Sequence, residues 1–127
     1  MVEHENNIAR LTLLESNIWL AEYKVSLIDE DTARAAVAFR LEVLDDDDIR
    51  LLADTTNIKS VTKAARDFLG TAAGYEGIEA SALVASSPLT VMLGNFYMKF
   101  STQPKPTRLV KNRDEGLAWL RSLKLDE

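Results

Sequence analysis

Short apolar runs alternate with amphipathic segments along most of this chain, and this alternation restricts the possible folds more than any other feature. Residues 49–54 and 80–85 are short and mostly apolar, as buried parallel strands usually are. Each run precedes a segment with apolar residues at spacings of three and four, the pattern of an amphipathic helix. Strands that alternate with helices imply parallel strands joined by right-handed crossovers.

The chain begins with two extended segments in place of a strand and a helix. Residues 8–14 and 18–25 are rich in β-branched, aromatic and leucine side chains and flank a turn-like sequence at 15–17. They predict an antiparallel hairpin after a polar terminus, residues 1–7, that we expect to be frayed. With a last strand over 107–111, the predicted order is β-β-α-β-α-β-α-β-α. The fold class is therefore α/β, a mixed and mostly parallel sheet with helices packed against it.

Each predicted helix follows side chains that commonly cap a helix N-terminus. These are Ser26 with Asp29, Ser60, Ser87 with Pro88, and Asn112 with Glu115. The first two helices carry apolar stripes at helical spacing: Ala33, Val37, Leu41 and Leu44 in the first, and Val61, Ala64, Ala65, Phe68, Leu69 and Ala72 in the second. Four aspartates, residues 45–48, follow the first helix and predict a loop, because negative charge opposes the dipole at a helix C-terminus.

Composition narrows the class of protein. The length of 127 residues suits one domain, residues 1–127, and 46% apolar residues can form its core. There is no cysteine, which excludes disulfides and thiolate sites and favours a cytoplasmic location. A net charge of −5 and an isoelectric point near 4.9 argue against a nucleic-acid binder. No apolar run approaches the roughly 18 residues of a membrane span.

Few residues suit catalysis. The single histidine, His4, lies in the terminus that we expect to be frayed, so a Ser-His-Asp triad is not expected. The glycines at 70, 74 and 77 lack the lysine and hydroxyl of a phosphate-binding loop. We expect no catalytic residue, metal or cofactor. The alternative is a weak hydrolase that uses Asp54 or a loop hydroxyl.

Polar side chains gather after the predicted parallel strands. In an open parallel sheet, ligands bind beyond the carboxyl ends of the strands, where helix N-termini favour anions. The candidate binding or regulatory residues at this edge are Asp54, Thr55, Thr56, Ser60, Thr62, Ser86 and Ser87. The same residue types are also ordinary caps and turns.

The helix predicted over residues 88–100 has more apolar surface than a helix on a sheet needs. Its candidate interface residues are Leu89, Met92, Leu93, Gly94, Asn95, Phe96, Tyr97 and Phe100. Apolar surface that the sheet does not bury is usually buried against another part of the chain, another protein or a ligand. Three covers are consistent with the sequence: the loop with Pro104 and Pro106 together with the last helix, a second copy in a two-fold dimer, or a hydrophobic ligand beneath the helix.

The predicted element order resembles the STAS domain, the fold of bacterial anti-sigma-factor antagonists. The second half is similar to a family of short bacterial proteins of uncharacterised function. The segments that carry this likeness are Ser87-Pro88-Leu89, Leu93-Gly94-Asn95-Phe96-Tyr97, Pro104-Lys105-Pro106-Thr107-Arg108-Leu109 and Ala118-Trp119-Leu120. The resemblance implies the fold, whereas one fold serves many functions.

The resemblance also implies a place for phosphorylation. Phosphorylatable STAS domains typically carry Asp-Ser-Ser-Gly, or a close variant, at the start of the helix after the third strand. The corresponding stretch here is Lys59-Ser60-Val61-Thr62, which keeps hydroxyls at 60 and 62 but lacks the aspartate and the glycine. Ser60 and Thr62 are thus candidate phosphosites, and the alternative role for Ser60 is that of a helix cap.

Two functions of different classes follow. The first is a non-catalytic regulatory or protein-interaction module, a homodimer that also contacts another regulatory protein. The second is a small-molecule binding protein for a lipid-like or anionic ligand. Neither involves a nucleic acid or a membrane span.

Overall fold

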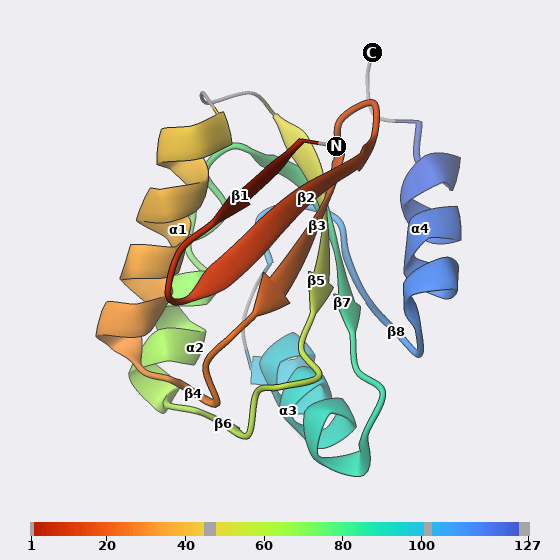
Figure 1. The fold of residues 1–127 in the computed structure, drawn as a ribbon. Coiled ribbons are helices and arrows are strands. Elements are labelled where there is room, and N and C mark those ends of the chain that lie inside the picture. Colours follow the sequence, from red (N-terminus) through yellow and green to blue (C-terminus); the bar gives the residue numbers. More distant parts are fainter. Residues whose placement is uncertain (1, 45–47, 101–102, 125–127) are drawn as a thin grey trace.

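The computed structural model describes residues 2–44, 48–100 and 103–124, without the side chains of Phe96 and Phe100. Its elements, in chain order, are β1 (Glu3–Glu5), β2 (Ala9–Glu15), β3 (Ile18–Tyr23), β4 (Leu27–Ile28), α1 (Glu30–Leu44), β5 (Ile49–Asp54), β6 (Ser60–Val61), α2 (Lys63–Leu69), β7 (Ile78–Val84), α3 (Pro88–Phe100), β8 (Thr107–Val110) and α4 (Arg113–Ser122). Figure 1 shows these elements as a central sheet with helices on its two faces.

The main sheet has the order β1-β2-β3-β5-β7-β8. β1, β2 and β3 pair antiparallel, and every later pairing is parallel. The predicted hairpin is β2 and β3, and its turn places Ser16 at a positive φ of 43°. The mixed, mostly parallel α/β fold is thus confirmed. The parallel strands β3, β5, β7 and β8 end at one edge of the sheet, where the predicted polar residues follow them.

Alternation along the central strands divides the core into two parts. Leu51 and Ala53 of β5 face α1, α2 and α3, whereas Leu52 between them faces α4. α4 lies alone on its side of the sheet (Figure 1). The sheet therefore has an α4 face and an α1–α3 face, and the two are packed differently.

The first helix starts later than the sequence predicts. Ser26 does not cap it; α1 begins at Glu30, and the Asp29 carboxylate accepts the Thr32 N–H at 2.8 Å. The two residues before Asp29 form β4, which pairs in parallel with β6. The pairing of β4 with β6 keeps residues 27 and 28 extended, so α1 begins after them. Burial on this helix also extends to Arg40, which the apolar stripe did not include.

The second helix also begins later, and a different hydroxyl caps it. Thr62 is the N-cap, and its side chain accepts the Ala65 N–H at 3.1 Å. The prediction that Ser60 caps α2 was wrong, because Ser60 lies in β6 and pairs with Leu27. The helix ends at Leu69, so Ala72 lies beyond it.

The N-terminal residues are ordered further than expected. Residues 3–5 form β1, which pairs with β2, although the sequence predicts fraying over residues 1–7. The Leu13 N–H also donates to the Val2 carbonyl at 2.9 Å. Backbone pairing to a neighbouring strand, which polarity alone does not reveal, orders this segment.

The other two helix starts follow their sequence signals. The Ser87 Oγ accepts the Thr90 N–H at 3.2 Å and the Thr90 Oγ1 accepts the Ser87 N–H at 3.1 Å, a reciprocal cap at the start of α3. Asn112 accepts the Glu115 N–H at 2.8 Å at the start of α4. None of the helices described is long and apolar enough to cross a membrane.

Candidate functional site

Asp54 is the centre of the polar group at the strand ends. Its Oδ1 accepts the N–H and the hydroxyl of Thr56 at 2.9 and 2.5 Å, and its Oδ2 accepts the Arg113 Nε–H at 2.8 Å. Burial by itself would raise the pKa of Asp54, but the hydrogen bonds from Thr56 and the Arg113 guanidinium outweigh it and hold that pKa below its usual range. The Asp54 carboxylate is therefore ionised and connects its own loop to Arg113 of α4.

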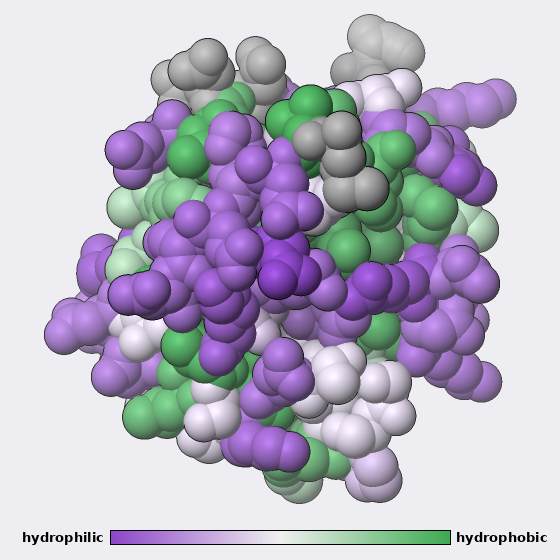
Figure 2. Space-filling view, viewed as in Figure 1, coloured by the Kyte–Doolittle hydropathy of each residue, from purple (hydrophilic) through white to green (hydrophobic). Residues whose placement is uncertain are grey.

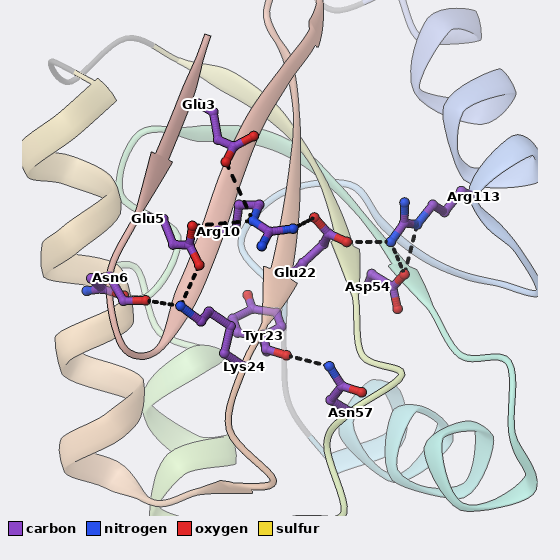
Figure 3. Close-up of polar contacts among 10 residues, drawn as sticks. All are labelled: Glu3, Glu5, Asn6, Arg10, Glu22, Tyr23, Lys24, Asp54, Asn57 and Arg113. Atoms are coloured by element: carbon purple, nitrogen blue, oxygen red, sulfur yellow. Dashed lines mark hydrogen bonds and ion pairs between the residues drawn. The ribbon is translucent and has the colours of Figure 1, made fainter. Parts of the chain in front are cut away.

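Charged residues continue from Asp54 across the neighbouring strands (Figure 3). Arg113 also pairs with Glu22 at 2.9 Å, and the other Glu22 oxygen lies 3.6 Å from the Arg10 guanidinium. Arg10 in turn lies 3.6 Å from carboxylates of Glu3 and Glu5 on β1. Figure 2 shows hydrophilic side chains over this part of the sheet, the area in front of β1 to β3. This ladder of alternating charges lies beside α4, over the part of that sheet face in front of β1 to β3, where no described helix packs.

The structure brings together only part of the predicted site at the strand ends. Thr56 and Ser86 lie 3.5 Å apart through their hydroxyl oxygens, and the Thr55 hydroxyl donates to the Val84 carbonyl at 2.6 Å. Ser87 is engaged in the cap of α3. Within the residues described, no hydrogen bond connects Ser60 or Thr62 to this group.

Two charged residues beside Asp54, Arg113 and Glu22, were not among the site residues predicted from the sequence. Both had a usable signal. Arg113 directly follows Asn112, which the predicted topology already placed at this edge. Glu22 lies near the end of β3, and β3 runs parallel to β5, with Glu22 opposite Asp54. The four-aspartate run lies outside the described residues except for Asp48, which is exposed.

The histidine does not join any of these groups. His4 lies on β1 with its ring centroid 6.0 Å from that of Trp19. The Asp54 carboxylate is occupied by three donors. These contacts join the loop after β5 to Arg113 at the start of α4.

A cavity of about 170 Å³ lies on the opposite, α1–α3 face of the sheet. Its apolar wall comes from the sheet and the three helices, through Leu11, Ala21, Leu51, Ala53 and Leu83 of the strands and Ala33, Ala36, Val37, Leu69 and Leu93 of the helices. Several of these side chains are alanines. Small side chains leave space that larger ones would fill.

Hydroxyl groups form one polar part of the cavity wall. The Tyr97 hydroxyl of α3 lies 3.1 Å from the Leu69 carbonyl and 3.2 Å from the Tyr75 hydroxyl. Tyr75 in turn lies 2.6 Å from the Thr107 hydroxyl of β8. Burial, followed by the hydrogen bond with Tyr75, raises the pKa of Tyr97 far above its usual value, so the phenol stays protonated. The hydroxyls of Tyr97, Tyr75 and Thr107 therefore act as hydrogen-bond partners for one another.

Arg40 forms another polar part of the cavity wall. Its side chain borders the cavity from α1, and the residue is only 6% exposed. Its two terminal nitrogens donate to the carbonyls of Glu76 and Gly74, at 2.6 and 3.1 Å. These carbonyls flank Tyr75, so Arg40 also fixes the loop that carries the tyrosine. Sequence reasoning missed Arg40, because a basic residue on an otherwise apolar stripe looks like an ordinary surface position.

The predicted interface helix, α3, divides its apolar residues between the cavity and the surface. Leu93, Gly94 and Tyr97 border the cavity, whereas Met92 is 57% exposed. Leu89 is partly buried and Asn95 is exposed; the side chains of Phe96 and Phe100 lie outside the described residues. Gly94 permits a close approach within the chain, since a Cβ there would lie 2.5 Å from a methyl group of Leu109.

The comparisons with known proteins agree with this fold. The chain is similar to the crystal structure of an uncharacterised protein of the DUF3478 family, with a SpoIIAA-like fold, from Shewanella loihica PV-4. The TM-score is 0.60 at 15% identity, over 92% of this chain and 98% of that one. The SpoIIAA-like fold is STAS-like, so the predicted resemblance is confirmed at the level of fold. No curated protein matches the chain. Residues 12–124 match the family model described as a domain of unknown function, DUF7793, and the chain belongs to that family.

Proposed function

We propose that this protein binds a small, largely apolar molecule in the cavity of the α1–α3 face, without catalysis. The observation that carries the proposal is the size of the cavity, about 170 Å³ inside a folded chain of 127 residues. An apolar cavity of about 150 Å³ engineered into another protein binds benzene or xenon. The space here is therefore large enough for a ring or a short alkyl chain.

The space is bordered largely by apolar side chains. Protein interiors are packed as densely as organic crystals. Side chains that border an unfilled space lack packing partners on that side and forfeit van der Waals contacts. A bound apolar molecule would restore the missing van der Waals contacts.

The proposal is tested by filling the cavity. Ala36 borders it from α1, and Ala35 beside it is exposed. We expect isothermal titration of the wild-type protein with 1-octanol to show saturable binding. Ala36→Phe should weaken binding at least about tenfold by placing a ring in the space, and Ala35→Phe should bind like wild type. Circular dichroism checks that both variants fold.

Two results would contradict the proposal. One is the absence of octanol binding to the wild-type protein. The other is equal binding by wild type and a folded Ala36→Phe variant, which would place the ligand elsewhere.

A regulatory, protein-interacting role is a second candidate. The SpoIIAA-like fold and the exposed apolar residues of α3 support it: Val91 and Met92 are 38% and 57% exposed. A homodimer through this surface predicts that Met92→Lys gives a folded monomer, while Leu14→Lys, at a 39% exposed site on β2, leaves the dimer intact. Light scattering coupled to size exclusion measures this, and a wild-type monomer would contradict the dimer.

Regulation by phosphate is the remaining part of that role. Ser60 and Thr62 are both exposed, but the Thr62 hydroxyl already caps α2. Ser60 is therefore the better phosphosite of the two. Ser60→Asp should change the binding of a partner protein without a change in melting temperature, and Ser60→Ala should not. If neither variant alters any interaction, Ser60 has no regulatory role.

A further inference from the structure

Arg40 is a cation buried in the wall of the proposed binding cavity. It is 6% exposed and comes from the middle of α1, next to apolar neighbours on the same helix face such as Val37. Lysine and arginine are almost never fully buried unless they are paired. The position of Arg40 therefore needs an explanation beyond helix packing.

The hydrogen bonds of Arg40 to the loop around Tyr75 explain only part of its burial. Two nitrogens of Arg40 donate to the Glu76 and Gly74 carbonyls. A guanidinium has five N–H groups and carries a full charge that carbonyls do not neutralise. Among the residues described, no carboxylate forms an ion pair with Arg40. Glu76, an exposed residue, attracts it only at longer range, and the Tyr23 phenol is the other titratable group near it.

The burial of Arg40 is reflected in its pKa. Burial lowers the pKa of Arg40, and the nearby Tyr23 and Glu76 only partly oppose that change. A buried charge without a partner of opposite sign is unfavourable. An anion in the cavity would neutralise the guanidinium, and hydrogen bonds between the two would be charge-assisted.

We propose that the ligand is an amphiphilic anion, with a carboxylate head bound by Arg40 and an alkyl tail along the apolar wall. This inference rests on the proposed function and adds the chemical class of the ligand. The apolar side chains described above accommodate the tail, since Leu51, Leu83 and Leu93 border the same space. The planar guanidinium matches a carboxylate in geometry.

Arg66 is a second cation at the cavity and serves as the matched control. It is only partly buried, comes from α2, and donates to the Val61 carbonyl at 3.0 Å. Solvent screens a partly exposed charge, so Arg66 contributes less to an anionic head than Arg40 does. Arg66→Gln and Arg40→Gln remove the same charge from the two positions.

The test compares three eight-carbon ligands at pH 7: octanoate, 1-octanol and octylamine. In the wild-type protein, octanoate should bind at least about tenfold more tightly than octanol, the effect of a charge-assisted hydrogen bond, and octylamine should bind weakest. Arg40→Gln should reduce octanoate to the level of octanol and leave octanol within about twofold. Arg66→Gln should bind octanoate as wild type does.

The outcomes separate this inference from the proposed function. If octanol and octanoate bind equally and Ala36→Phe blocks both, the cavity binds ligands but Arg40 does not select an anion. If Arg66→Gln, and not Arg40→Gln, removes the preference for octanoate, the assignment to Arg40 is overturned. If none of the ligands binds, the proposed function itself fails. Should Arg40→Gln not fold, equal wild-type affinities for the three ligands would still overturn the inference.

Discussion

The two faces of the sheet receive side chains from the same strands, yet only one of them is filled. On the α4 face, Leu120 is completely buried and packs with Leu52 and the small residues Ala80 and Ala82. On the α1–α3 face, similar strand residues border a cavity of about 170 Å³. Because the strands contribute both sets by simple alternation, the helices decide which face is filled.

The helices differ in the side chains that they place against the sheet. α4 has Gly116 against the strands, where a Cβ would lie 2.5 Å from Leu52 Cδ1. Both ends of α4 also form hydrogen bonds with the sheet. At its start, Arg113 donates to Asp54. Near its end, the Leu120 carbonyl accepts from the Arg50 guanidinium at 2.5 Å. α1 brings alanines and the Arg40 charge to the opposite face. We infer that one face stabilises the fold while the other leaves room for a ligand.

The largest expected effect comes from truncating neighbouring leucines of β5 that face opposite ways. Leu52→Ala should lower the free energy of unfolding by about 3–5 kcal/mol, because it opens a void in a filled core. Leu51→Ala should have a smaller effect, about 2 kcal/mol, since Leu51 already borders empty space and loses fewer contacts. Urea denaturation measures both. Equal losses would mean that the two faces are packed alike.

An intermediate effect is expected from adding a methyl group to the two helical glycines. Gly116→Ala should destabilise the protein by about 1–2 kcal/mol, because the methyl group would meet Leu52, Val110 and Ala82 at 2.5, 3.1 and 3.4 Å. Gly94→Ala should be neutral or slightly stabilising. The three atoms nearest to its methyl group all belong to Leu109, whose flexible end borders the cavity and can move, and alanine favours a helix. Thermal melts should therefore shift in different directions, and a larger loss for Gly94→Ala would contradict this account.

An effect of similar size, which depends on pH, is expected at the ion pair between α4 and the sheet. Asp54→Asn should lower stability by about 1–2 kcal/mol at pH 7. Because the pKa of Asp54 is lowered in the folded state, its contribution is complete above the unfolded value of about 3.9 and is lost as pH falls through the lower folded value. The difference between variant and wild type should therefore shrink below about pH 4.

The control for this pH effect is a more exposed carboxylate that also pairs with α4. Glu15→Gln removes the partner of Arg121, and both side chains are substantially exposed, at 37% and 55%. Solvent screens such an exposed pair, so it contributes less to stability than the pair of Asp54 with Arg113 does. A loss from Glu15→Gln as large as that from Asp54→Asn would show that burial of the pair is unimportant.

The elements with strong local signals were predictable from the sequence. The apolar run of β5, the N-cap at Ser87 and the N-cap at Asn112 are determined by neighbours in sequence, and all three occur as predicted. The start of α1 and the cap of α2 were not. They depend on the pairing of β4 with β6, which joins segments about thirty residues apart and leaves no periodic pattern in two residues.

The candidate site was less accessible to sequence reasoning than the fold. Asp54 and Thr56 were found because topology places strand ends together, but their partner Arg113 depends on how α4 is oriented. The cavity depends on the distance between layers, and a row of alanines predicts a buried face without saying whether that face is filled. The buried position of Arg40 involves contacts with the carbonyls of Gly74 and Glu76, which lie more than thirty residues away in the sequence.

We infer that a ligand enters the α1–α3 face of the sheet and not the α4 face. Methyl nuclear magnetic resonance during a titration with 1-octanol tests it directly, because leucines report from both sides of one sheet. We predict saturable shifts at Leu51, Leu83 and Leu93, with Leu52 and Leu120 unchanged. Shifts at Leu52 and Leu120, or no saturable shift at any of these methyl groups, would contradict the claim.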